Sequence, residues 1–379
     1  MIDRCRARNV PVVFYSKEDP PNYDRFVGIA KKCDFVFTSC EEVIQKYRTD
    51  CGHDRVYAMR FGINPVVHNP VGRNFRKGMP NVIFSGSWMA KYSERCKDLC
   101  MLFDGVLAAG RKLDIVARNY ANRGNPAYHW PDKYFSMISP AMPHDELQKV
   151  HRLYDWAVNI NSVQDSRTMF ANRVYELQAC GNLLLSNFSL GVKETFPGVF
   201  IVKSQEDVVK ALSLSPEKVA ARQAAGVRRV MTGETCFDRI AFMLNTVGLS
   251  AKVSSRKVLV IAQDVKKVQH AFDAQSYQDK FLREITDVTA RDFDEADIVA
   301  FFGNHEKYDE FYLEDMTNAF KYTNCDYVCK SKDGDGGCHD YVSRVDNKWR
   351  TMFWRASFEM NELLSGNDSF DRENGYQIP

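Results

Sequence analysis

The sequence has no long uninterrupted hydrophobic run and no excess of charge of one sign. No window reaches the roughly 18 apolar residues of a membrane-spanning helix, so we expect no membrane span. The 51 lysines and arginines against 49 aspartates and glutamates leave a net charge of +2, which argues against a strongly basic nucleic-acid-binding face. The 11 cysteines are odd in number and irregularly spaced, and no secretory signal precedes them. We therefore expect reduced thiols in a cytoplasmic protein, with peripheral contact at the membrane face as an alternative.

The length of 379 residues allows two or three domains. The pattern of the first part of the chain predicts an α/β fold. Apolar runs at Val10–Tyr15, Asp34–Thr38 and Arg55–Met59 predict strands, and amphipathic stretches between them predict helices. This βαβαβ order is typical of a parallel sheet with crossover helices. The stretch Asn64–Met79 contains two prolines and two glycines and little periodicity, so we interpret it as an interdomain connection.

A second βα series predicts another parallel sheet, whose first strand is Asn81–Ser85 and whose last strands are Leu183–Ser186 and Val199–Val202. Its strands end in Gly, Ser, Asn or Asp, and ligands of doubly wound sheets bind outside such strand ends. A third unit begins with a strand at Lys257–Ala262, and we expect the polar end after about Glu359 to fray. The predicted fold is α/β, with two Rossmann-like units, of which the first is truncated, and a small C-terminal domain. The expected domains are residues 1–75, 76–250 and 255–379.

Three motifs of the middle unit carry candidate chemistry. The first is the strand-to-helix turn at Gly86 and Ser87, where a glycine lets backbone N–H groups approach a phosphate. Lys91 and Arg95 follow and have the charge to neutralise a diphosphate. The alternative is an ordinary turn followed by a solvated helix face.

The second motif, Pro143–Leu147 (PHDEL), suits the first turn of a helix, and an ordinary capped helix explains it equally well. The third motif is a strand, a polar loop and a helix over Asn159–Gly181, with Gly181 as the stop signal. Arg173 and Glu176 are three residues apart on one helix face, where they suit phosphates and a ribose diol. A surface ion pair is the alternative.

The order of these motifs resembles the donor half of GT-B glycosyltransferases. After the Gly-Ser turn come PHDEL, then RVYELQACG at Arg173–Gly181, then SNFSLGVKE at Ser186–Glu194. More narrowly, the pattern is similar to the CgeB-like spore-maturation and teichoic or capsular polymer branch of the "glycosyl transferases group 1" enzymes. The resemblance covers roughly residues 10–200.

The resemblance implies that the middle unit binds a nucleotide-sugar donor. Glu176 would hold the ribose hydroxyls, and Arg95 and Arg173, with Lys91, would stabilise the leaving diphosphate. The other positions that it implies for donor binding are Gly86, Ser87, Arg118, His144, Ser189 and Gly191. Glu18 and Asp19 would face the cleft near the acceptor and complete a catalytic set with the two arginines.

The chemistry of such a site can be stated independently. Breaking a sugar–phosphate bond places negative charge on the leaving diphosphate, which preorganised cations stabilise. An inverting enzyme would need a general base, for which Glu18, Asp19 and His144 are the candidates, whereas a retaining one would not. We expect no cofactor besides the nucleotide-sugar co-substrate and no required divalent metal.

The expected function is sugar transfer to a glycan or cell-surface polymer. The alternatives are a polyol-phosphate or sugar-phosphate transferase of cell-wall polymer synthesis and a non-catalytic glycan- or nucleotide-binding protein. We expect no nucleic-acid partner. The short N-terminal unit leaves open a homo-oligomer or a separate partner that completes it.

The C-terminal unit resembles a degenerate GT-A family-2 domain, through Gln275–Gln278 and Asp297–Met316. Its stretch Gly303–Glu306 lacks the paired aspartates that hold a divalent metal there, so we assign it packing or acceptor contact. A further set, Cys325, Cys329, Cys338 and His339, has zinc-ligand residue types. Because the first two flank a predicted strand, about 13 Å apart, we assign no metal ligand.

Overall fold

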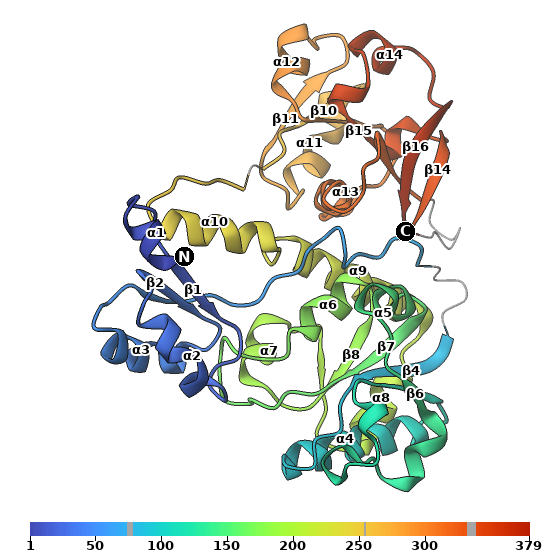
Figure 1. Cartoon of the computed structure of the whole chain (residues 1–379). Coiled ribbons are helices and arrows are strands. Elements are labelled where there is room, and N and C mark those ends of the chain that lie inside the picture. The colour runs from blue at the N-terminus through green and yellow to red at the C-terminus, as the bar shows by residue number, and fades with distance from the viewer. Residues whose placement is uncertain (74–78, 254, 332–338) are drawn as a thin grey trace. The chain divides into compact units, whose positions relative to one another are not determined.

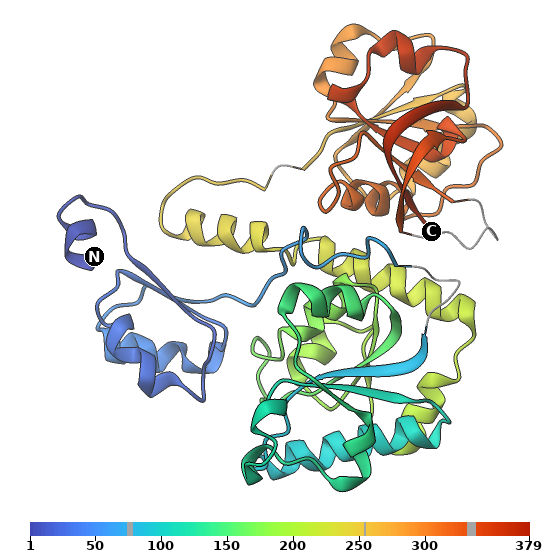
Figure 2. The same ribbon diagram turned by 45° about the vertical axis from the view of Figure 1, so that its right-hand side comes forward.

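The computed structural model describes residues 1–73, 79–253, 255–331 and 339–379, which fall into two units. Unit 1 comprises residues 1–64 and 79–252, and unit 2 comprises residues 65–78 and 253–379. Both units are α/β, as Figures 1 and 2 show. Within the described ranges, no helix is both long enough and apolar enough to cross a membrane.

Three parallel strands form the first sheet of unit 1, in the order β1-β2-β3. Val36 and Phe37 of the middle strand are fully buried, and the rings of Tyr23 and Tyr47 join the two crossover helices at a centroid distance of 4.5 Å. The predicted βαβαβ order is therefore confirmed. The elements are α1 (Ile2–Arg6), β1 (Val13–Ser16), α2 (Tyr23–Ala30), β2 (Phe35–Thr38), α3 (Ile44–Cys51) and β3 (Val56–Ala58).

Six parallel strands form the second sheet of unit 1, in the order β6-β5-β4-β7-β8-β9. The strand order reverses between β4 and β7, which is where a doubly wound sheet opens a crevice at the carboxyl ends of its strands. The strands are β4 (Met79–Gly86), β5 (Leu113–Ala117), β6 (Ile138–Pro140), β7 (Tyr154–Asn159), β8 (Leu183–Ser186) and β9 (Phe200–Ile201). The helices are α4 (Ser93–Ala108), α5 (His144–His151), α6 (Arg173–Ala179), α7 (Leu190–Thr195), α8 (Gln205–Leu212), α9 (Pro216–Met231) and α10 (Cys236–Thr246).

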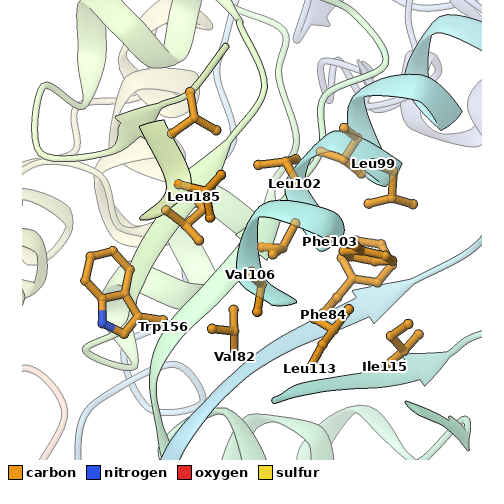
Figure 3. Close-up of a cluster of buried hydrophobic side chains, with 14 of the residues drawn as sticks. Val82, Phe84, Leu99, Leu102, Phe103, Val106, Leu113, Ile115, Trp156 and Leu185 are labelled. Atoms are coloured by element: carbon orange, nitrogen blue, oxygen red, sulfur yellow. The ribbon is translucent and has the colours of Figure 1, made fainter. Parts of the chain in front are cut away.

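Helix α4 buries one face of this sheet and supplies much of its core. Figure 2 shows α4, in teal, on one side of the light-blue strand β4, with the green helix α5 on the other. Leu99, Leu102, Phe103 and Val106 recur at helical spacing and are fully buried. Figure 3 shows these side chains facing residues of β4, β5, β7 and β8, among them Phe84, whose ring packs edge-on against Phe103.

Residues 59–64, which follow the first sheet of unit 1, contact the turn between α9 and α10. These contacts connect the two sheets. Ile63 forms a parallel bridge with Thr235, and a Cβ on Gly62 would lie 2.9 Å from the carbonyl oxygen of Thr235. The buried carboxylate of Glu234 binds three guanidiniums, which belong to Arg60, Arg229 and Arg239. Because Arg60 follows the first sheet and Glu234 follows the second, this cluster fixes the connection between the sheets.

The polar loop before α6 is longer than the sequence indicates. We expect a helix over Arg167–Cys180, but α6 begins at Arg173. The hydroxyl of Ser166 accepts the backbone N–H groups of Thr168 and Met169, which holds this part of the loop in a non-helical turn. Helix α7 was not predicted, because its six residues lack a full amphipathic repeat.

Unit 2 contains a seven-stranded mixed sheet in the order β11-β10-β12-β15-β13-β16-β14. Strand β15 runs antiparallel to both neighbours, β12 and β13. The expected fraying of the chain end is wrong, because β16 pairs with β13 and β14 and its Tyr376 is fully buried. The elements are β10 (Val258–Ala262), α11 (Val265–Asp273), β11 (Lys280–Glu284), α12 (Ala290–Glu295), β12 (Ile298–Phe302), α13 (Tyr312–Ala319), β13 (Tyr327–Lys330), β14 (Asp340–Val345), β15 (Thr351–Trp354), α14 (Met360–Leu364) and β16 (Phe370–Ile378).

Gly105 tests the packing of α4 against α8, and Gly28 in α2 is its control. Replacing a helical glycine by alanine usually stabilises a protein by about 0.5–1 kcal/mol, and we expect this for Gly28→Ala, whose Cβ meets nothing within 4 Å. A Cβ on Gly105 would lie 2.7 Å from Cβ of Val208, so we expect Gly105→Ala to destabilise the chain by about 1–3 kcal/mol. Urea unfolding followed by circular dichroism measures both. Stabilisation by Gly105→Ala would contradict the described contact.

Candidate functional site

The carboxyl end of β4 presents three consecutive carbonyl groups, each of which accepts a hydrogen bond from a different arginine. The guanidinium of Arg173 donates to the carbonyl of Ser85, and the guanidinium of Arg95 donates to that of Ser87 at 3.0 Å. Between them, the backbone N–H of Arg118 donates to the carbonyl of Gly86 at 2.8 Å. The structure thus brings three arginines to the end of one strand.

The topology of unit 1 explains why residues so far apart in sequence meet here. Arg95 is the third residue of α4, Arg118 directly follows β5, and Arg173 is the first residue of α6. Parallel strands place their carboxyl ends at one edge of the sheet, and the helices that follow them begin at that edge. The end of β4 is fixed further by the buried hydroxyl of Ser85, which lies 2.6 Å from Nε2 of His151.

The three arginines form a concentration of positive charge. Burial lowers the pKa of Arg95, and burial together with the charges of Arg118 and Arg95 lowers the pKa of Arg173 to about 10, although Glu176 opposes this. In the part of the chain that the structure describes, no carboxylate lies within 4 Å of these guanidiniums, and Nε of Arg173 is buried without a hydrogen-bond partner. Partly buried positive charges of this kind favour an anionic ligand.

Glu176 lies on α6 one turn after Arg173. Its Oε1 accepts a hydrogen bond of 2.7 Å from the side chain of Asn172, and its charge acts on Arg173. A carboxylate one turn from a guanidinium can accept hydroxyl groups of a ligand whose anionic part binds the guanidinium. The structure therefore brings Glu176 to the same helix terminus as Arg173.

Gly86 and Ser87 lie within this site, and the structure gives the glycine a packing role. A Cβ at position 86 would lie 2.6 Å from the ring of Phe84, so a larger residue would displace a core side chain. Ser87 contributes its carbonyl to Arg95 and its hydroxyl to Asn119. Lys91 is exposed and lies over the ring of Tyr92, 4.6 Å from its centroid.

The other positions implied for donor binding lie on α5 and α7. His144 is the exposed first residue of α5. Ser189 caps α7, and the N–H of Gly191 donates to the carbonyl of Ser166 at 3.0 Å. A Cβ on Gly191 would lie 2.5 Å from Phe170, so this glycine permits α7 to pack on the loop before α6.

Glu18 and Asp19 do not lie together on one surface. Asp19 is completely buried and accepts hydrogen bonds from the hydroxyls of Thr38 and Tyr47, at 2.6 and 3.3 Å. Its carboxylate therefore links β2 and α3 inside the first sheet's core. Glu18 is exposed and accepts a hydrogen bond from Asn22.

The sequence analysis missed a set of polar side chains on the same elements of unit 1. Asp98 on α4, Asn161 after β7 and Asn187 after β8 are linked by hydrogen bonds. The sequence predicts strands at Ala157–Asn161 and Leu183–Ser186, so Asn161 ends one predicted strand and Asn187 directly follows the other. Those positions are the signal that was available. A cavity of about 620 Å³ opens elsewhere in unit 1, along β5 and β6, and its lining does not include the three arginines.

In unit 2, the Gly303–Glu306 stretch and the cysteine cluster have local partners. Glu306 pairs with Arg350 at 2.7 Å and accepts a hydrogen bond from Asn347. His339 is buried beside Tyr376, and burial, with a smaller effect of Arg73, lowers its pKa to about 3. Cys325 and Cys329 are free thiols, and Cys338 lies outside the described residues.

Comparison with known proteins finds one family that resembles the central segment. Residues 103–245 match the model of a family described as glycosyl transferase-like. This segment runs from α4 to α10 and is similar to glycosyl transferases. It contains Arg118, Arg173 and Glu176, whereas Arg95 precedes it. The search of curated proteins found no match.

Three solved structures illustrate what the chain is similar to. HepE from Anabaena, in complex with UDP and glucose, is 10% identical over 65% of this chain and 74% of that chain, with a TM-score of 0.48. An alpha-glucosyltransferase in complex with UDP and a 13-mer DNA is 12% identical over 65% and 76%, with a TM-score of 0.46. An alpha,alpha-trehalose-phosphate synthase from Burkholderia vietnamiensis is 15% identical over 65% and 69%, with a TM-score of 0.44.

The arginine cluster predicts binding of inorganic pyrophosphate. We expect Arg173→Gln to weaken this binding by about ten- to a hundredfold, because a hydrogen bond to a charged group contributes about 1.5–3 kcal/mol. Arg291→Gln, which removes an exposed arginine from unit 2, is the matched control. Isothermal titration calorimetry measures both affinities. Equal affinities of the two variants would show that Arg173 does not contact the anion.

Proposed function

We propose that this chain is a nucleotide-sugar-dependent glycosyltransferase whose donor site is the carboxyl end of β4. The observation that carries the proposal is the convergence of Arg95, Arg118 and Arg173 on the carbonyls of residues 85–87. The glycosyl transferase-like family match over residues 103–245 supports the reaction class.

In this proposal the guanidiniums bind the diphosphate of the donor. When the bond from the sugar to the diphosphate breaks, negative charge accumulates on the leaving oxygens. Because Arg173 and Arg95 are already held by carbonyl groups, they need little reorganisation to meet that charge. The arginines thus supply positive charge without a resident cofactor or a required divalent metal.

Glu176 would accept hydrogen bonds from the ribose hydroxyls of the same donor. It follows Arg173 by three residues on α6, so phosphates at the helix terminus place the ribose within its reach. Gly86 and Ser87 would border the phosphates through their backbone. Lys91, His144, Ser189 and Gly191 remain proposed contacts of the donor.

The acceptor side is proposed to be residues 1–75, with residues 76–250 as the donor domain. The resemblance to the CgeB-like branch favours a glycan or cell-surface polymer as the acceptor, handled at the cytoplasmic face. Of the candidate bases for an inverting reaction, Glu18 and His144 are exposed. Asp19 is a poor candidate because Thr38 and Tyr47 bind its carboxylate in the interior.

Residues 255–379 are proposed to be a GT-A-like domain without a catalytic site of its own. The only acidic residue of Gly303–Glu306 is Glu306, and Arg350 and Asn347 both bind it. A carboxylate used in this way is a weak ligand for a divalent metal. This supports a role in packing or acceptor contact.

The replacement Glu176→Ala tests the donor assignment. We expect it to weaken binding of the preferred nucleoside diphosphate, chosen by titrating UDP, GDP and CDP, by about tenfold or more through the lost ribose hydrogen bonds. Binding of inorganic pyrophosphate, which has no ribose, should stay within about twofold.

Glu194→Ala, at an exposed ion pair with Arg167, is the control. Nucleotide affinity equal to that of the control would refute the ribose role. Failure of UDP, GDP and CDP to bind the unmodified chain would refute the transferase proposal and favour the non-catalytic alternative.

A further inference from the structure

A network of two buried asparagines and the half-buried side chains of Asp98 and Gln164 connects the helix of Arg95 with the start of the helix of Arg173. Asp98 lies on α4, three residues after Arg95. Its Oδ2 accepts two hydrogen bonds, from Nδ2 of Asn187 at 2.8 Å and from Nε2 of Gln164 at 3.1 Å. Asn187 follows β8, and Gln164 belongs to the loop that precedes α6.

Asn187 and Asn161 continue the network to α6. Oδ1 of Asn187 accepts the backbone N–H of Asn161 at 2.8 Å, and its Nδ2 donates to the carbonyl of Asn161 at 3.1 Å. Oδ1 of Asn161 then accepts the backbone N–H of Ala171 at 3.0 Å, two residues before Arg173. Both asparagines are 1% exposed, so these bonds are shielded from water.

The network extends from α4, which carries Arg95, to the loop that leads into Arg173. It joins four separate segments, namely α4, the end of β7, the end of β8 and the loop before α6. Each asparagine uses both its oxygen and its nitrogen, so a change at one member alters the position of the others. Asp98 itself forms no ion pair with Arg95 or Arg173 among the described residues, so its effect on them is positional.

We propose that Asp98, Asn161 and Asn187 are positioning residues that hold Arg95 and Arg173 at the spacing of two linked phosphates. A single phosphate needs only one correctly placed guanidinium, whereas a diphosphate must match both at once. The network therefore selects diphosphate over monophosphate ligands. This inference rests on the anion-binding role in the proposed function, and it adds the residues that set the selectivity.

The test compares inorganic pyrophosphate with inorganic phosphate as probes, in the full chain. Asp98→Leu removes the acceptor, and we expect it to lower the affinity for pyrophosphate by about ten- to a hundredfold, the loss expected when one charged hydrogen bond to the ligand is misaligned. The affinity for phosphate should change by less than about threefold. Asp98→Asn keeps an amide oxygen that can accept both hydrogen bonds, so we expect it to retain the preference of the unmodified chain.

A second variant keeps the test decisive if Asp98→Leu does not fold. Asn187→Ser shortens the bridging side chain without adding bulk, and we expect the same selective loss of pyrophosphate binding. Circular dichroism and thermal melting identify folded variants. An unchanged pyrophosphate-to-phosphate ratio in a folded Asp98→Leu or Asn187→Ser chain would overturn the inference, and so would equal losses of both affinities.

The outcome separates this inference from the proposed function. If the unmodified chain binds pyrophosphate selectively but binds no nucleoside diphosphate, the positioning role stands and the transferase proposal fails. If nucleotides bind and Asp98→Leu leaves the ratio unchanged, the transferase proposal stands and the positioning role fails. If the unmodified chain binds neither pyrophosphate nor nucleotide, both are overturned.

Discussion

The proposed site depends on one interaction, the contact between the carbonyl groups at the end of β4 and the arginines that surround them. Carbonyl dipoles offset part of the cost of holding like charges close together, and they orient the guanidiniums before any ligand arrives. Burial is the main cause of the lowered pKa of Arg173, and the charges of Arg118 and Arg95 add to it. In the proposed function, the diphosphate of the donor offsets the rest of this cost when it binds the guanidiniums.

The rest of unit 1 keeps that strand end in place. The core beneath α4 fixes β4 through Phe84, and Gly86 leaves room for its ring. The Asp98 network positions the helices that carry the arginines. The Glu234 cluster joins the donor sheet to the first sheet, where the acceptor is proposed to bind. The core, the Asp98 network and the Glu234 cluster are each built from local contacts. Together they determine where a few guanidinium groups lie.

Much of this fold is readable from the sequence, because buried parallel strands form continuous apolar runs. The sequence predicts a strand at Leu113–Ala117 and a helix at Pro216–Met231, and the structure has both elements with these bounds. The final strand, Phe370–Ile378, is not predictable in this way, since its polar residues gain stability only from the strands beside it. The residue types and the order of the motifs also predict Arg95 and Arg173 as candidate site residues. The burial of Asp19 is not readable, because it depends on partners from other elements.

The most direct measurement is a crystal structure with the nucleoside diphosphate that binds most tightly. Our account predicts that both phosphate groups lie beyond the end of β4, within hydrogen-bond distance of the guanidiniums of Arg95 and Arg173, with the ribose beside Glu176. Phosphates bound elsewhere, for example in the cavity along β5 and β6, would contradict it.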